Sequence, residues 1–365
     1  MPKRIRLACT AAALVPVVVL AAACSSGSSS TTPTASTSSA PKTGKLSETG
    51  SSLLFPLFSG WTTGYTGAHP GIKLSTASTS SGVGVTDAAQ GLVDIGTSDE
   101  PLSTSDATQY PTLINVPLAV AGLMVTYNVT GVTAPLNLSG TVLAEIYTGK
   151  ITTWNDPAIA ALNPGVTLPS QKIVTIHRGD SAGSTVLLTE YMNAQAPGDW
   201  PSADIGTTIT WPTVPGALSE TGSGAMVTAN GSTPGSISYV GVSYLSKVTA
   251  AKLSQAALEN GAGKYVTATL SSIAAALASF PTPSASGSAD LINTKAATGF
   301  PITNYEYAIV NKSQTSATQA ALIQNFLTWA VTTGNSSSYL AKVGFVALPS
   351  GTLSVSNGLI GSISG

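Results

Sequence analysis

The sequence is poor in cysteine, histidine and charge. Only two of its 365 residues are cysteine and only two are histidine, so a framework of disulfides and a cysteine–histidine metal centre are both excluded. Lys, Arg, Asp and Glu make up 8% of the chain, against about 25% in ordinary soluble proteins, and the net charge is −1. There is no basic patch, so we expect no nucleic-acid partner. The sequence predicts neither a metal nor a cofactor.

The first 23 residues have the pattern of a secretory signal. Three basic residues precede an apolar stretch over 7–23 that is too short and too interrupted for a membrane span. Cys24 follows, and the segment resembles a bacterial lipoprotein signal, in which the cysteine is acylated and becomes the new N-terminus. Ala21 stands where such signals usually carry leucine, so the alternative is an ordinary cleaved signal. The sequence predicts a lipid anchor at Cys24, on the extracytoplasmic face of the cell membrane.

The composition changes after this cysteine. Residues 24–44 consist of Cys24 and a stretch rich in serine, threonine and proline, without large apolar side chains, which predicts a flexible tether. About 320 residues remain, a length that favours two domains over one core. Short apolar runs alternate with helical periodicity in this part, and that alternation predicts an α/β fold.

The expected elements follow from these periodicities. We expect strands over 72–76, 93–96, 113–117, 123–127, 173–176, 236–240 and 305–310. We expect helices over 52–64, 82–90, 139–147, 157–162, 184–193, 271–280, 317–333 and 338–343. No internal repeat is present.

Three turns rich in serine and glycine stand directly before predicted helices. They occupy 50–52, 80–82 and 181–184. Serine caps a helix by accepting from its free N–H groups, and those groups together with the helix dipole attract anions. One such turn is ordinary capping, whereas three that converge would form an anion site. Arg178 precedes the third turn and Asp99 follows a predicted strand, so both are candidate charged groups of the site.

One motif suggests a different class of protein. Residues 179–183 match G-x-S-x-G, which would make Ser181 the nucleophile of a hydrolase. An α/β-hydrolase needs a histidine after that serine, but His69 and His177 both precede it. The order His69, Asp99, Ser181 would require an all-β double barrel, which the predicted helices contradict. We predict that the protein is not an enzyme, with a secreted serine esterase as the alternative.

Several segments together resemble the PstS family, the phosphate-binding lipoproteins of the phosphate ABC transporter, and are closest to its actinobacterial branch. The segments are 147–178, which is the most specific, and 48–61, 93–102, 234–241 and 300–310. The resemblance implies an α/β periplasmic-binding-protein-like fold of type II, with two lobes and a central ligand cleft. The implied lobes are 45–118 plus 303–365, and 119–302.

The resemblance also implies a function and a set of site residues. It implies a monomer that binds inorganic phosphate and hands it to the permease subunits of an ABC transporter. The implied phosphate-binding residues are Ser51, Ser52, Leu53, Ser81, Asp99, Arg178, Ala182, Gly183 and Ser184. Asp180 is implied to hold Arg178 in place. Ala182 stands where the family usually has a serine, which leaves open whether Ser181 or a water molecule replaces the lost hydroxyl.

The chemistry of phosphate agrees with an acidic residue in such a site. Phosphate keeps a proton near neutral pH because its second pKa is about 6 to 7, and Asp99 could accept that proton in a hydrogen bond. Sulfate has no proton to offer and would meet the carboxylate as a like charge. A receptor for sulfate or molybdate is the alternative within the same class of protein, and Asp99 argues against it.

Overall fold

The computed structural model describes residues 41–132 and 134–365. These residues belong to one compact unit, Ala40–Gly365. The predicted signal peptide, Cys24 and most of the predicted tether lie outside the described residues. Among the helices that are described, none combines the length and the apolar character needed to cross a membrane.

A mixed sheet of nine strands organises this unit. Its strands lie in the order β2-β1-β3-β12-β4-β8-β6-β7, and β9 also pairs with β4. The strands are β1 (Gly44–Gly50), β2 (Ile72–Ser78), β3 (Ile95–Ser98), β4 (Leu113–Tyr127), β6 (Val174–Arg178), β7 (Leu218–Glu220), β8 (Ser236–Gly241), β9 (Ser254–Gln255) and β12 (Thr303–Asn311). A small second sheet has the order β11-β10-β5, with β5 (Asn137–Leu138), β10 (Ala257–Glu259) and β11 (Tyr265–Val266).

Strand β4 joins the two halves of the large sheet. Its first part pairs antiparallel with β12, and its last five residues, Leu123–Tyr127, pair antiparallel with β8. The sequence predicts two separate strands here, whereas the structure has one strand of 15 residues. The lobe limits proposed from the sequence stay a prediction, and the limit between 118 and 119 falls inside this strand.

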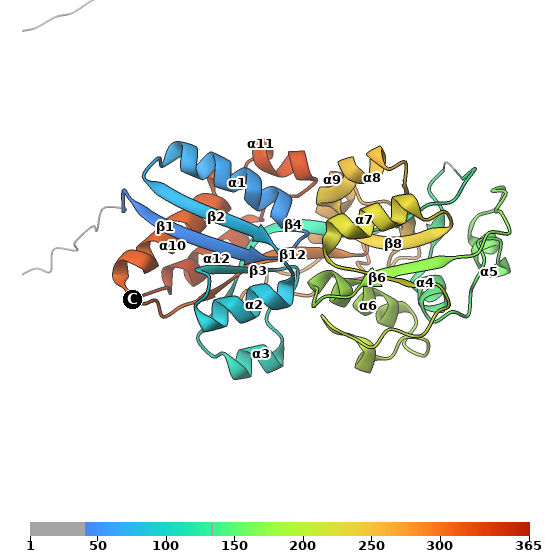
Figure 1. The fold of residues 1–365 in the computed structure, drawn as a ribbon, viewed down its shortest axis with the longest axis horizontal. Helices are drawn as coiled ribbons and strands as arrows, with labels where there is room; N and C mark the ends of the chain where they lie inside the picture. Colours follow the sequence, from blue (N-terminus) through green and yellow to red (C-terminus); the bar gives the residue numbers. More distant parts are fainter. Residues whose placement is uncertain (1–40, 133) are drawn as a thin grey trace, which may run out of the picture. The chain divides into compact units, whose positions relative to one another are not determined.

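The helices cover both faces of the sheet. Figure 1 shows α1 on one side of β1–β3 and α2 on the other, while α7 and α6 lie on opposite sides of β6. The helices are α1 (Phe55–Ala68), α2 (Ser81–Gln90), α3 (Thr104–Gln109), α4 (Gly140–Tyr147), α5 (Pro157–Leu162), α6 (Gly183–Gln195), α7 (Gly222–Ser232), α8 (Leu245–Ala250), α9 (Leu270–Leu277), α10 (Ala317–Val331), α11 (Ser337–Leu340) and α12 (Ser350–Gly361).

Aromatic packing fixes α1 against α10. The ring centroids of Phe58 and Phe326 lie 5.3 Å apart, and Tyr65 contacts Phe326 edge-on at 5.1 Å. Trp61 is fully buried and donates from Nε1 to the carbonyl oxygen of Gly334 at 2.8 Å. Each buried aromatic side chain removes a large apolar area from water, and these rings thereby hold the start of α1 in place.

The parallel strands direct their carboxyl ends toward one place. On one side, β1 runs parallel to β2 and β3, and on the other side β6 runs parallel to β7 and β8. Strands β1, β2, β6 and β7 each lead into a helix, namely α1, α2, α6 and α7. In open α/β sheets, ligands bind outside the carboxyl ends of strands, where such helix N-termini lie.

Candidate anion site

The first serine turn is tied to the end of β3. The N–H of Ser51 donates to the carbonyl oxygen of Thr97 at 3.0 Å and to its Oγ1 at 2.9 Å. The Ser51 hydroxyl accepts from the N–H of Leu54 at 2.9 Å and donates to Oδ1 of Asp99. The turn before α1 and the acidic residue after β3 are thus joined, and the sequence analysis predicts both for the site.

Arg178 joins the first turn to the third. Its Nη1 donates to the hydroxyl oxygens of Ser52 and Ser184, at 3.2 Å in each case. The second turn meets the third directly, because the N–H of Gly82 donates to the carbonyl oxygen of Ser181 at 3.0 Å. The N-termini of α1, α2 and α6 therefore meet at one buried place.

Two glycines permit this close approach. A Cβ atom on Gly183 would lie 2.9 Å from Cβ of Asp99 and 3.0 Å from Oγ of Ser81. A Cβ on Gly82 would lie 2.1 Å from Oγ of Ser181. A side chain at either position would force its neighbours to shift, so glycine lets the start of α6 pack this closely against Asp99 and α2.

The third turn differs from the expectation in one detail. Ala182 is buried, and its N–H donates to the carbonyl oxygen of Thr207 at 2.9 Å. This N–H is therefore already engaged within the protein. The N–H of Ser184 instead interacts with the carboxyl of Asp99. Among the N–H groups of residues 182–184, that of Gly183 therefore remains the candidate for an anion, together with the hydroxyl of Ser184.

The charged groups of the site are almost wholly buried. Asp99 is 2% exposed and Arg178 is 4% exposed. Asp180 accepts from Nε and Nη2 of Arg178, which is the fork geometry that guanidinium groups prefer. Burial works against the charge of Arg178, but its hydrogen bond and ion pair with Asp180 raise its pKa above the ordinary value, so it stays a cation.

Asp99 experiences opposing influences. Burial raises its pKa, while the Ser51 hydroxyl, the positive charge of Arg178 and the N–H of Ser184 lower it, and the net direction is upward. A carboxyl surrounded by a cation and donors can carry a negative charge even when it is buried. It can then act as an acceptor toward a ligand that brings its own proton.

All of the predicted site residues that the structure describes lie together. Leu53 is fully buried at the first turn, and Ser81 accepts from the N–H of Asp99 at 3.4 Å. Cys24, the predicted lipidation site, lies outside the described residues.

Sequence reasoning missed further residues of the site. Ser223, at the start of α7, shares a hydrogen bond of 2.8 Å with the hydroxyl of Ser52 and donates to it from its N–H at 3.1 Å. Thr221-Gly222-Ser223-Gly224 is a turn of the same kind as the other three, but the helix after it has only a weak apolar pattern. Glu306 is fully buried in β12 and interacts with Asp99. The signal that could have indicated Glu306 was an acidic residue within a largely apolar strand of a chain that has few charges.

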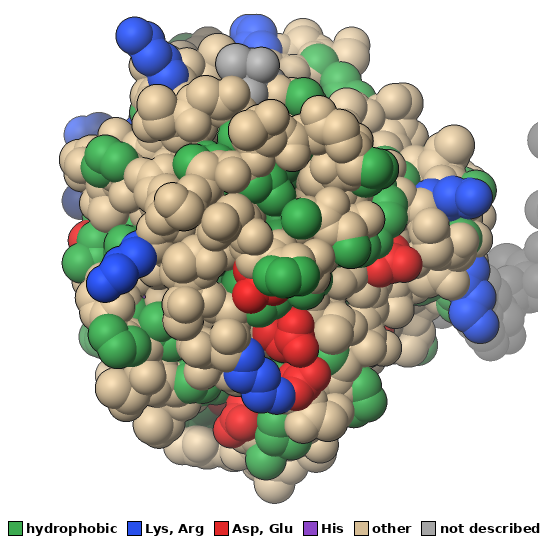
Figure 2. Space-filling view, turned by 90° about the vertical axis from the view of Figure 1, so that its right-hand side faces the viewer, with side chains coloured by type: hydrophobic (Ala, Val, Ile, Leu, Met, Phe, Trp, Pro, Cys, Tyr) green, Lys and Arg blue, Asp and Glu red, His purple; other side chains and the backbone are tan. Residues whose placement is uncertain are grey.

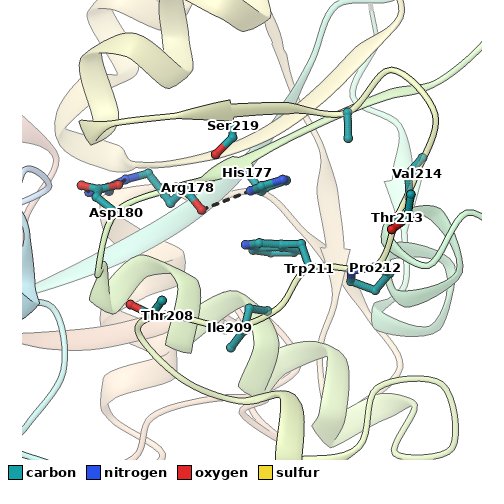
Figure 3. Close-up of a pocket in the computed structure, with 12 residues that line it drawn as sticks. His177, Arg178, Asp180, Thr208, Ile209, Trp211, Pro212, Thr213, Val214 and Ser219 are labelled. Carbon is teal, nitrogen blue, oxygen red and sulfur yellow. Dashed lines mark hydrogen bonds and ion pairs between the residues drawn. The ribbon is translucent and has the colours of Figure 1, made fainter.

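Three cavities adjoin the site. The first, of about 450 Å³, lies beside Arg178 and Asp180, and Figure 3 shows the rings of His177 and Trp211, which line it, lying one above the other. The second, of about 740 Å³, we call the carboxylate-lined cavity, and its acidic lining residues are Asp99, Glu100, Asp106, Glu190 and Asp290. The third, of about 830 Å³, we call the lysine-side cavity, and its charged lining residues are Asp180, Lys247 and Lys342.

Charge is scarce on the surface as well. Figure 2 shows a face on which most side chains are neutral, and several acidic side chains lie around a basic one near its centre. Within residues 41–132 and 134–365, no group of three or more His, Cys, Asp or Glu side chains could hold a metal ion. Local dipoles and the few placed charges described above are thus the means by which this chain can attract an anion.

In the described part of the chain, both histidines make contacts away from Ser181. Nδ1 of His177 interacts with the carbonyl oxygen of Arg178 at 3.1 Å, and its ring stacks on Trp211 at 4.7 Å. His69 stacks on Tyr65 at the C-terminal end of α1. In the described part of the chain, neither histidine forms a hydrogen bond with Ser181, so the geometry gives the esterase alternative no support.

The fold and the site define a class of protein, the substrate-binding proteins of the periplasmic-binding type. Residues 35–333 match the family model described as the PBP superfamily domain. A high-affinity periplasmic phosphate-binding protein, solved with phosphate bound, shares the fold with a TM-score of 0.68 and 22% identity, covering 85% of this chain and 92% of that one. The architecture is therefore the type II periplasmic-binding-protein fold, as the sequence predicts.

Comparison with curated sequences gives the family. The phosphate-binding protein PstS of Methanocaldococcus jannaschii is 33% identical over 86% of this chain and 85% of its own length. PstS of Xylella fastidiosa is 31% identical over 82% of this chain and 81% of its own length. The chain belongs to the PstS family of phosphate-binding proteins. Its placement in the actinobacterial branch stays a prediction.

Proposed function

We propose that this chain binds inorganic phosphate outside the cytoplasmic membrane and delivers it to the permease of an ABC transporter. One observation carries the proposal: three helix N-termini, a buried arginine and a buried aspartate lie together at the carboxyl ends of the strands. Such a site suits a small anion that carries both negative charge and a proton. The relatives that bear the PstS name are phosphate-binding proteins, which supports the same ligand.

Each part of the proposed site has a role in this proposal. Arg178 supplies the positive charge, and Asp180 keeps its fork oriented. The hydroxyls of Ser52, Ser81 and Ser184, with the N–H groups of Leu53 and Gly183, are the proposed neutral donors. Asp99, held by the Ser51 hydroxyl and the Ser184 N–H, is the proposed acceptor of the phosphate proton. Ala182 contributes through the shape of the turn, since its own N–H is engaged with Thr207. The reaction is capture and release without a chemical step.

The proposal includes a place in the cell. We infer that Cys24 is acylated and holds a monomer at the extracytoplasmic face of the membrane, with residues 24–44 as a tether between the anchor and the folded unit. The basis is the lipoprotein-type pattern of residues 1–24. Cell fractionation with Cys24→Ala tests it: the variant should leave the membrane fraction. A variant that stays with the membrane would contradict the anchor.

Ligand identity is tested by equilibrium titration of residues 25–365 after removal of any bound anion. Phosphate, sulfate and molybdate are titrated separately at pH 7. Saturable binding of phosphate alone supports the proposal, because Asp99 should repel anions that carry no proton. Binding of sulfate or molybdate in preference to phosphate would reassign the site to the receptor for fully ionised oxyanions.

A further inference from the structure

Glu306 is a buried acid to which the proposed function assigns no role. It lies in the middle of β12, is fully buried, and is followed by a shift in register between β12 and β4. Such irregularities redirect side chains locally. On the opposite strand, the register passes from Ala119 to Pro117, and Asn335 donates to the carbonyl oxygen of Leu118 between them at 2.6 Å.

Asn304 fixes this acid beside Asp99. Its Nδ2 donates to Oε1 of Glu306 at 2.8 Å and to the backbone carbonyl oxygen of Asp99 at 2.9 Å. The carboxyl groups of Glu306 and Asp99 interact with each other. Oε2 of Glu306 is buried, and no hydrogen bond to it from another described residue meets ordinary geometric limits.

The surroundings of the two carboxyls are unequal. Asp99 has the Ser51 hydroxyl, the Ser184 N–H and the charge of Arg178 to stabilise its anion. Glu306 has only the amide of Asn304, and no lysine or arginine forms an ion pair with it in the described chain. Besides Asp99, the ionisable group that interacts with it is Tyr307 on its own strand. Two buried carboxylates cannot both be ionised at such short range, so the better-stabilised one keeps the charge.

We propose that Glu306 is a specificity-determining residue of this site: its carboxyl carries a proton on Oε2 and donates it in a hydrogen bond to Asp99, which fixes the single negative charge of the pair on Asp99. This inference rests on the proposed phosphate function and deepens it. Burial and the neighbouring Asp99 raise the pKa of Glu306 well above its ordinary value, in agreement with the geometry.

The location of the proton decides which anions can be bound. With the proton on Glu306, Asp99 is only an acceptor, and it accepts the proton of phosphate while it repels sulfate. With the proton on Asp99 instead, the same carboxyl would be a donor and could form a hydrogen bond to a fully ionised oxyanion. Glu306 therefore acts through Asp99, without touching the ligand, to keep the site selective for a protonated anion.

Two substitutions separate this role from simple packing. Glu306→Gln places an amide in the same volume, and the amide can donate to Asp99 and accept from Asn304, as the protonated acid does. Glu306→Leu keeps apolar volume but removes the donor. Glu145→Gln, on α4 and outside the site, is the matched control. Residues 25–365, which omit the predicted signal and Cys24, contain the described part of the compact unit and are titrated with phosphate and with sulfate at pH 7.

We expect E306Q to bind phosphate within about threefold of the parent and to keep excluding sulfate. E306L should lose at least about tenfold in the ratio of phosphate to sulfate affinity, because Asp99 loses a hydrogen bond that stabilises its charge. A shift of E306Q toward sulfate would overturn the proposal, because an amide that donates to Asp99 as the protonated acid does should leave the discrimination unchanged. Stronger exclusion of sulfate by E306Q than by the parent would also overturn it, because Glu306 would then carry the charge in the parent and Asp99 the proton. An unchanged ratio in E306L would also overturn it, since Glu306 would then only fill space.

A second readout does not depend on the ligand. The infrared difference spectrum between the parent and either folded variant should contain the carbonyl band of one protonated carboxyl at pH 7, and a carboxylate band in its place would contradict the proposal. If the parent itself binds no phosphate, the proposed function fails, while the spectrum still reports the proton on Glu306. The two failures are thus distinguishable.

Discussion

A line of hydrogen bonds connects a second buried acid, Glu48, to the site. Oγ1 of Thr97 donates to Oε1 of Glu48 at 2.7 Å and accepts from the N–H of Ser51 at 2.9 Å. Ser51 in turn donates to Asp99. Because the threonine hydroxyl gives its proton to Glu48, its lone pairs are free for Ser51, and so the acid in β1 orients the first turn through Thr97.

This acid should make stability depend on pH. Burial raises the pKa of Glu48 from 4.5 to about 7, despite hydrogen bonds from Thr76 and Thr97. The folded state then holds the proton more tightly than the unfolded state, so the contribution is fully present below pH 4.5 and is lost as the pH rises through about 7. We expect the free energy of unfolding to fall by at most about 3 kcal/mol from this group between pH 4.5 and 8.

The check is denaturant unfolding of the parent and of Glu48→Gln at pH 5 and pH 8. The variant should be less sensitive to this change in pH, and its stability relative to the parent should improve at pH 8. Glu259→Gln is the control, since Glu259 lies in β10, in the small second sheet and away from Glu48. An equal pH dependence in the parent and in E48Q would mean that Glu48 titrates alike in the folded and unfolded states.

At the scale of the elements, the start of α6 packs closely against the loop after β3. A Cβ on Gly183 would lie within 3.2 Å of the backbone nitrogen of Asp99 as well as close to its Cβ. The backbone of Asp99 cannot move aside as easily as the end of a flexible side chain can. A methyl group here must therefore push α6 away from Asp99.

We predict that Gly183→Ala lowers phosphate affinity at least tenfold and destabilises the fold by about 1–3 kcal/mol, the usual effect of overpacking. Gly60→Ala is the control, because a Cβ there also meets nothing within 4 Å, and Gly60 is an exposed residue within α1, outside the site. Titration calorimetry and thermal unfolding of both variants make the comparison. Normal affinity in G183A would show that the two elements can separate without harm to the site.

The elements also show how far sequence reasoning reaches. Helix α5 occupies 157–162 as predicted, and α2 and α10 begin within one residue of the prediction, because serine turns or proline mark their starts clearly. Strand β1 was missed, since its polar sequence, GKLSETG, has no apolar run, although Glu48 and Thr49 are buried in it. Helices α7 and α12 were missed because small and polar residues dominate both.

The site was predictable where a local pattern marked it. Each serine turn and the neighbouring Arg178 could be recognised from adjacent residues alone. The contacts of Glu306 and Ser223 could not be recognised in this way, because they join distant parts of the chain. Glu306 in β12 interacts with Asp99 after β3, 207 positions earlier. Ser223 in α7 bonds to Ser52 in the first turn, 171 positions earlier. Only the folded sheet brings these residues together.

At the scale of the whole molecule, the two larger cavities differ in sign. The carboxylate-lined cavity reaches Asp99, whereas the lysine-side cavity contains Lys247 and Lys342 and reaches Ser223 and Asp180. In a chain of net charge −1, this local difference dominates the field that an approaching anion meets. We therefore expect phosphate to enter and leave through the lysine-side cavity.

Neutralising both lysines, Lys247→Gln with Lys342→Gln, should slow phosphate association by roughly two- to tenfold at low salt and less at high salt. Stopped-flow fluorescence measures this rate. The control neutralises the other side, Glu190→Gln with Asp290→Asn, and should leave the rate nearly unchanged. Faster association in the control, with no effect of the lysine substitutions, would place the route on the carboxylate side.

The central claim is that Asp99 makes the buried site selective for an anion that carries a proton. Its most direct test is calorimetric titration of residues 25–365 and of Asp99→Asn with phosphate and with sulfate at pH 7. The account predicts that the parent binds phosphate only, and that D99N binds phosphate at least about tenfold more weakly while it gains sulfate binding. Equal discrimination by the parent and D99N would contradict the account, because selectivity would then not reside in this carboxylate.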